Sequence, residues 1–88
     1  MNEKELEKVL KALANKRRVA ILKYLKRKGT ASVGEIADAI KLSFKATSKH
    51  SMILFNADIV EKEQISLTML YFLPKNHHPI VGKLLSII

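Results

Sequence analysis

Residues 32–54, SVGEIADAIKLSFKATSKHSMIL, contain the pattern that most clearly indicates the fold. It opens with Ser32 followed three residues later by Glu35, which is the capping-box pattern that begins a helix. Apolar residues then recur at helical spacing as far as residue 40, and Ser43 offers a second N-cap after a very short turn. Two helices joined in this way form a helix-turn-helix motif, which we expect at about residues 32–57.

The second helix of this motif has polar, basic first turns and an apolar C-terminal half. A recognition helix needs this division, because its N-terminal residues meet the base edges of DNA while its later turns pack on the domain. Lys45, Ser48 and Lys49 share one face, and lysine binds either guanine O6 and N7 or phosphate. Phe44 could touch a thymine methyl or form an exposed edge of the core, and the sequence leaves both open. The DNA contacts predicted for this helix are Ser43, Phe44, Lys45, Thr47, Ser48 and Lys49.

Beyond residue 58 the period of the apolar pattern changes from helical to two. Asp58 is expected to end the recognition helix, and residues 59–64 and 65–73 to form a hairpin that turns near residues 64–66. A helix-turn-helix followed directly by a hairpin is a winged helix, with its wing here at about residues 59–73. The wing has an apolar tip and carries one base, Lys62, against two acids. Lys62 is the DNA contact that we predict for the wing.

Three more helices are expected outside the motif. Apolar residues at helical spacing predict a first helix over about residues 3–14, and Asn15 caps a second helix that Gly29 ends. Pro79 fits the first position of a last, strongly apolar helix at about residues 79–88. A domain this small cannot cover the apolar stripes of both terminal helices, and such patches usually indicate a partner.

Length and composition fit one small domain, residues 1–88, of the mainly α winged helix-turn-helix class with a small β-hairpin, in the order α-α-α-α-β-β-α. Sixteen basic residues against eight acidic ones give a formal net charge of +8, which favours a polyanion partner. The alternative is a lysine-rich surface that only keeps the protein soluble. The N-terminus of the second helix of a winged helix often faces the DNA backbone, so Lys16 and Arg17 join the predicted DNA contacts.

Several kinds of site are not expected. The chain has no cysteine, no nucleophile–base–acid set and no phosphate-binding loop, so we predict neither an enzyme nor a cofactor or metal site. His50 is expected to pack inside the domain, and His78, beside His77, to cap the last helix. No apolar run is long enough to span a membrane and the N-terminus MNEKELEK is not a signal peptide, so we expect a cytoplasmic protein.

Three phrases of the sequence resemble those of the ArsR-like bacterial and archaeal repressors. The first, LKALANKRRVAILKYL, is similar to the family's ALADPTRLRILxLL. The second, residues 32–54, is similar to SVGELAExLGLSQSxVSxHLxxL. The third, NADIVEKEQ…LYFL, is similar to xAGLVxxRREGRxxxYxL. The resemblance implies a dimeric, sequence-specific DNA-binding transcriptional repressor whose recognition helices lie about 34 Å apart and bind an inverted repeat. It also implies that Arg18 is structural and that the terminal helices, about 3–14 and 79–88, form the homodimer. The predicted interface residues are Leu6, Leu10, Leu13, Ile80, Leu84 and Ile88.

The sequence departs from this family in three places. Ser51 stands where the family usually has leucine, and if buried its hydroxyl is expected to bond back to the carbonyl of Thr47. The family's arginine-rich wing is replaced by an acidic one. The metal ligands of the best-known members are missing, because the third helix has no cysteine and the last helix offers only Lys83 and Ser86. A winged helix that binds other proteins instead of DNA is therefore the alternative function.

Overall fold

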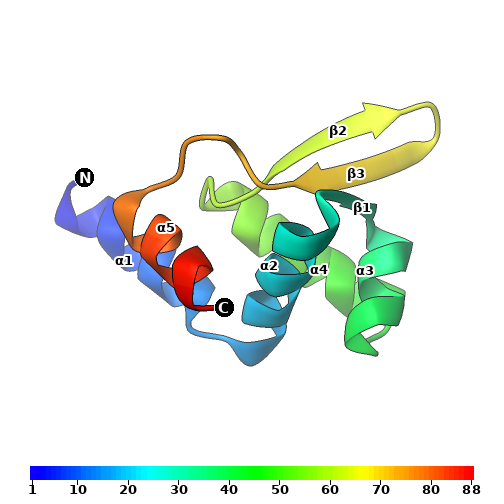
Figure 1. Cartoon of the computed structure of the whole chain (residues 1–88), viewed down its shortest axis with the longest axis horizontal. Coiled ribbons are helices and arrows are strands. Elements are labelled where there is room, and N and C mark those ends of the chain that lie inside the picture. Colours follow the sequence, from blue (N-terminus) through cyan, green and yellow to red (C-terminus); the bar gives the residue numbers. More distant parts are fainter.

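The computed structural model describes all 88 residues and forms a winged helix-turn-helix domain, as the sequence predicts. Figure 1 shows the first and last helices together at one end of the long axis, and the third helix and the tip of the hairpin at the other end. The elements are α1 Glu3–Leu13, α2 Lys16–Lys28, β1 Thr30–Ser32, α3 Val33–Ile40, α4 Phe44–Asn56, β2 Glu61–Ile65, β3 Thr68–Phe72 and α5 Pro79–Ile87.

The predicted caps set the helix boundaries. The Asn15 side chain accepts hydrogen bonds from the backbone N–H groups of Arg17 and Arg18 at 2.9 and 3.1 Å, which starts α2. Ser32 and Glu35 form the capping box of α3: the Ser32 hydroxyl accepts from the Glu35 N–H at 3.2 Å, and the Glu35 carboxylate accepts from the Ser32 N–H at 2.9 Å. The hydrogen bond from the Ser32 backbone lowers the pKa of the Glu35 carboxyl.

The helix ends also follow the prediction, with one exception. Gly29 ends α2 at a φ of 94°, which favours glycine, and Asp58 follows α4 in the left-handed conformation at a φ of 58°. His78 occupies the N-cap position of α5 as predicted, but its side chain makes no capping hydrogen bond. Pro79 at the first position supplies the fixed φ with which α5 begins.

The sheet has one strand that was not predicted. Residues 30–32 form β1, which pairs antiparallel with β3, and β3 also pairs with β2, so the strand order is β1-β3-β2. The hairpin turns at Ser66 and Leu67 between the paired Ile65 and Thr68, slightly later than expected. Ser66 has a φ of 57°, a conformation that one central residue of a two-residue hairpin turn commonly adopts.

The core lies between α2, α3, α4 and the buried face of the sheet. The side chains of Ile21, Leu22 and Leu25 from α2 are at most 1 % exposed. They pack in one cluster with Ile36, Leu54, Val60 and Tyr71, and Val81 and Leu85 join α5 to it. Lys26 further ties α5 to α2, because its Nζ donates to the Leu85 carbonyl at 2.6 Å. The two helices of the helix-turn-helix, α3 and α4, are thus packed against α2 and the sheet.

Candidate DNA interface

The turn between α3 and α4 places the recognition helix. Lys41 adopts the left-handed conformation at a φ of 56°, and the Leu42 N–H donates to the Ala37 carbonyl at 3.0 Å. Ser43 then caps α4 as predicted, since its hydroxyl accepts from the Ala46 N–H at 3.1 Å. Ser43 is also exposed beside the first turn of α4.

The exposed face of α4 carries most of the predicted DNA contacts. Phe44, Lys45 and Lys49 are exposed and Ser48 is half-buried. The same stripe continues through the half-buried Met52 to the exposed Asn56, which the sequence analysis did not include. The signal was present, because residues 45, 49, 52 and 56 recur at helical spacing. Two basic side chains in the first turns of a helix provide the charge and the hydrogen-bond donors that the major groove accepts.

Thr47 is not part of this surface. Its side chain is 0 % exposed and its hydroxyl has no hydrogen-bond partner, so the prediction that Thr47 contacts DNA is wrong. Ser51, one helical turn later, is 1 % exposed and also lacks a partner, so the predicted bond to the Thr47 carbonyl does not form. Both side chains lie on the buried face of α4 together with Leu54, because residues three and four positions apart share one face of a helix.

Arg18 and His50 fasten the recognition helix to the rest of the domain. The Arg18 Nε donates to the Ala12 carbonyl at 2.6 Å, and its Nη2 donates to the Lys11 carbonyl at 3.2 Å. The Nη1 of Arg18 lies 3.1 Å from His50 Nδ1. Arg18 is therefore structural, as the resemblance implied, and joins the end of α1 to α4. Partial burial lowers the pKa of the His50 imidazole, and the neighbouring charges of Arg18, Arg17 and Lys49 lower it further.

Lys16 and Arg17 lie at the start of α2, where Lys16 is exposed and Arg17 half-buried. The backbone N–H of Arg17 is already bound by the Asn15 cap. A phosphate at this helix N-terminus would therefore bind mainly to the two cationic side chains, and less to the backbone N–H groups.

Lys62 is held against α4 at the base of the wing. Its Nζ lies 4.3 Å from the centre of the Phe55 ring and 3.4 Å from the Met52 sulfur. The Tyr71 hydroxyl, from the paired position on β3, donates to the same sulfur at 3.3 Å, and burial raises the pKa of that hydroxyl. The Met52 contacts join the wing to the recognition helix and place the one cation of the wing next to the C-terminal half of the α4 stripe.

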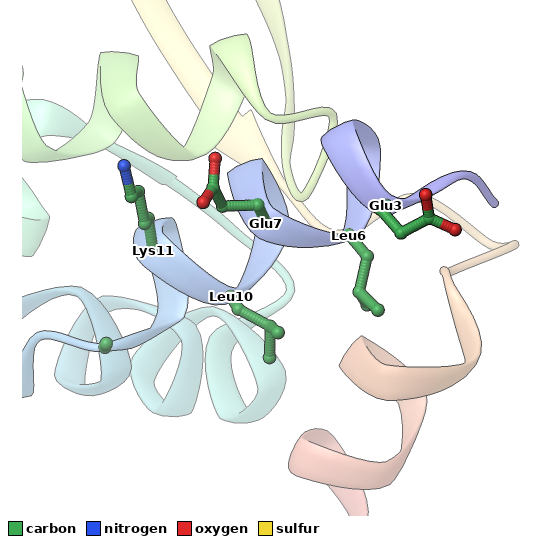
Figure 2. Close-up of a pocket in the computed structure, with 6 residues that line it drawn as sticks. Glu3, Leu6, Glu7, Leu10 and Lys11 are labelled. Carbon is green, nitrogen blue, oxygen red and sulfur yellow. The ribbon is translucent and has the colours of Figure 1, made fainter.

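The opposite end of the molecule is apolar and exposed. Leu6 and Leu10 are 36 % and 44 % exposed, and they line a groove on α1 with Glu3, Glu7, Lys11 and Ala14. Figure 2 shows both leucines pointing to one side of α1, toward α5, with Glu7 and Lys11 on the other side. On α5 the most exposed apolar residue is Ile87, at 74 %, which the sequence analysis did not select. The other predicted interface residues are half-buried and also pack on the core: Leu13, Ile80, Leu84 and Ile88.

The sequence model described as bacterial regulatory protein, arsR family, matches residues 15–62, which include α2, the helix-turn-helix and the start of the wing. The chain belongs to the ArsR family. This family consists of transcriptional regulators that bind DNA and are not enzymes.

Solved structures agree with this assignment to the ArsR family. Reduced HlyU from Vibrio cholerae is 30 % identical, with a TM-score of 0.80 over 98 % of this chain and 86 % of that one. The Mycobacterium bovis fragment Mb0332, described as a homodimeric winged helix-turn-helix DNA-binding domain, is 27 % identical, with a TM-score of 0.81 over 96 % of this chain and 74 % of that one. The antimony-specific repressor AntR is 25 % identical, with a TM-score of 0.79 over 96 % of this chain and 73 % of that one. Among curated protein sequences, none matches significantly.

The chain contains no cluster of side chains suited to a metal ion. Nowhere do three histidine, cysteine, aspartate or glutamate side chains gather closely enough to hold a metal ion. His77 and His78 share a groove with Asp58 and Glu61, yet the four do not form such a group. None of its helices combines the length and the apolar character needed to cross a bilayer.

Proposed function

We propose that this ArsR-family chain is a homodimeric repressor that binds an inverted repeat in duplex DNA and does not respond to metal ions. The observation that carries the proposal is the exposed stripe of α4, in which Lys45 and Lys49 flank Ser48 on a helix fixed by Arg18 and His50. Such a stripe fits the major groove, and the net charge of +8 attracts the duplex to it. A repressor of this kind acts where the chromosome is, in the cytoplasm of a prokaryotic cell.

The exposed apolar end supports the dimer. Leu6 and Leu10 line one exposed apolar groove on α1, and Ile87 is exposed on α5. A second copy can cover such side chains, and burial of each is worth about 1.5–3 kcal/mol. A two-fold axis at this end sets two α4 helices about one turn of duplex apart, which requires a symmetric site. The repressing direction is supported by AntR, which is described as a repressor, and dimerisation by Mb0332, which is described as homodimeric.

The proposed indifference to metals rests on the donor set. Without cysteine, only histidine and carboxylate ligands are available, and they do not gather in groups of three. Addition of zinc, cadmium or arsenite should therefore leave DNA affinity unchanged. A stoichiometric site of submicromolar affinity, measured by calorimetry, would contradict this part of the proposal.

The direct test uses a duplex that the wild-type protein enriches from a random library. Lys49→Ala should weaken binding by about 1–3 kcal/mol and relax the preference at one base pair if Lys49 binds guanine. If Lys49 pairs with phosphate, affinity should fall evenly over all sequences and the salt slope should shrink by about one. Lys75→Ala, which removes another exposed lysine, in the loop before α5, is the matched control and should have a smaller effect. Equal affinity of wild type and Lys49→Ala would exclude α4 as the recognition helix.

A protein-binding module is the second candidate, and the exposed acids Glu61 and Glu63 on β2 favour it. The dependence of affinity on salt distinguishes the two functions. A DNA-binding protein should show a steep fall of log K with log salt, because bound phosphates release counterions. A module should bind duplex DNA weakly and without sequence preference.

A further inference from the structure

The large exposed apolar side chains of this chain gather at two ends of the molecule. Leu6, Leu10 and Ile87 belong to the terminal helices, where the proposed dimer forms, and Met1 precedes the first of them. The other three, Phe44, Ile65 and Leu67, belong to the start of α4 and the tip of the wing. The dimer does not account for this second group.

Phe44 and Leu67 line the same groove. Phe44, 63 % exposed, is the first residue of α4, and Leu67, 97 % exposed, lies at the apex of the hairpin. Residues 32–34 at the start of α3 and residues 68–69 complete the groove, and none of its lining residues is charged. Because Phe44 directly precedes Lys45, the groove opens beside the turn of α4 that would enter the major groove.

The tip of the wing has no charge with which to bind phosphate. Residues 65–68 are Ile-Ser-Leu-Thr, and the only base of the wing, Lys62, is held at its foot against Phe55. The acids Glu61 and Glu63 lie on β2, further from the tip than Ile65. A contact between this tip and DNA therefore cannot be an ion pair. It can only involve polar groups such as the exposed hydroxyls of Ser66 and Thr68, or the exposed apolar side chains of Ile65 and Leu67.

The turn that carries Leu67 is short and braced. Only Ser66 and Leu67 connect the paired Ile65 and Thr68, and the Gln64 side-chain amide donates to the Ser66 carbonyl at 3.3 Å. A short braced turn loses little conformational entropy when it binds. Apolar side chains held in this way can enter the minor groove and wedge apart flexible base steps, which kinks the duplex.

We infer that Leu67 is an apolar wedge that the wing inserts into the minor groove beside each half-site. The wing then selects DNA by how easily its base steps deform, and not by ion pairs with the phosphates. The inference rests on the proposed DNA-binding function. Duplex DNA fits this surface better than a protein does, because the patch is continuous with the recognition helix.

The experiment compares Leu67→Ser, Leu67→Met and Leu67→Arg on a duplex that the wild-type protein enriches from a random library. Leu67→Ser should bind at least about tenfold more weakly, with an unchanged salt slope, because the lost contact is apolar. Leu67→Met should bind nearly as well as wild type, and Leu67→Arg should steepen the salt slope by about one for each tip. Energy transfer between dyes at the duplex ends should show a smaller bend with Leu67→Ser. Thermal unfolding should not change, since Leu67 is 97 % exposed.

The outcomes separate the inference from the function on which it rests. If Leu67→Ser binds and bends the duplex like wild type while Lys49→Ala binds more weakly, the recognition helix stands and the wedge is excluded. The patch would then serve a partner other than DNA. If the wild-type protein enriches no duplex, the proposed function fails and the wedge fails with it.

Discussion

Removal of either buried hydroxyl of α4 should stabilise the protein. The hydroxyls of Thr47 and Ser51 are enclosed in the core without hydrogen-bond partners, and an unsatisfied buried polar group costs about 1–3 kcal/mol. Valine has nearly the shape of threonine, so Thr47→Val removes the hydroxyl without opening a cavity. The expected gain of about 1–3 kcal/mol corresponds to a rise in Tm of at least about 4 °C for a domain of this size. Ser51→Ala should act in the same direction.

The assay is urea unfolding at a fixed protein concentration, because the stability of a dimer depends on concentration. Ser48→Ala is the control: it lies on the same helix, is half-buried, and gains the same helix propensity of a few tenths of a kcal/mol as Ser51→Ala. DNA affinity should be unchanged in Thr47→Val, since that side chain does not reach the surface. A Thr47→Val protein no more stable than wild type would show that its hydroxyl is hydrogen-bonded in the native state, for instance to the carbonyl four residues earlier.

Three further predictions concern other parts of the molecule. Leu10→Lys, at an exposed position of α1, should give a monomer in sedimentation, and a dimer of unchanged affinity would place the interface elsewhere. The native state lowers the pKa of His50, so the unfolded imidazole takes up its proton first as pH falls below about 6.5, and the free energy of unfolding decreases. His50→Gln should therefore lose less stability than wild type between about pH 8 and pH 5, and equal losses would contradict the shift. Gly29→Ala should destabilise the fold by about 1–3 kcal/mol in urea unfolding, because its φ of 94° strains any residue with a side chain; no change would mean that the helix end relaxes.

The helix boundaries could be predicted because their causes are local. Asn15, Ser32 and Ser43 bond to backbone groups two or three residues away, so the sequence contains the whole interaction. The strand β1 could not be predicted in this way. Its three residues are extended because they pair with β3, about forty residues later in the chain.

The candidate site could be predicted less completely than the fold. The helical period fixes which residues share a face, but polar residue types placed Thr47 outside, although its spacing to Leu54 puts it on the buried face. The contacts of Lys62 with Phe55 and Met52 depend on how the wing folds back on α4, and no local pattern contains that. Likewise, the apolar residues of α5 include both core and surface residues. Their spacing alone could not show that Ile87 is the exposed one.

The symmetry of the DNA site shows whether a dimer binds it through α4. Purified wild-type protein should be used to enrich duplexes from a random library, and the stoichiometry on the enriched site should be measured by sedimentation. A dimer whose α4 helices enter successive major grooves predicts an inverted repeat with half-site centres about 10–10.5 base pairs apart, bound by two chains. An asymmetric site bound by one chain, or no enriched sequence at all, would contradict a dimeric repressor that reads DNA through α4.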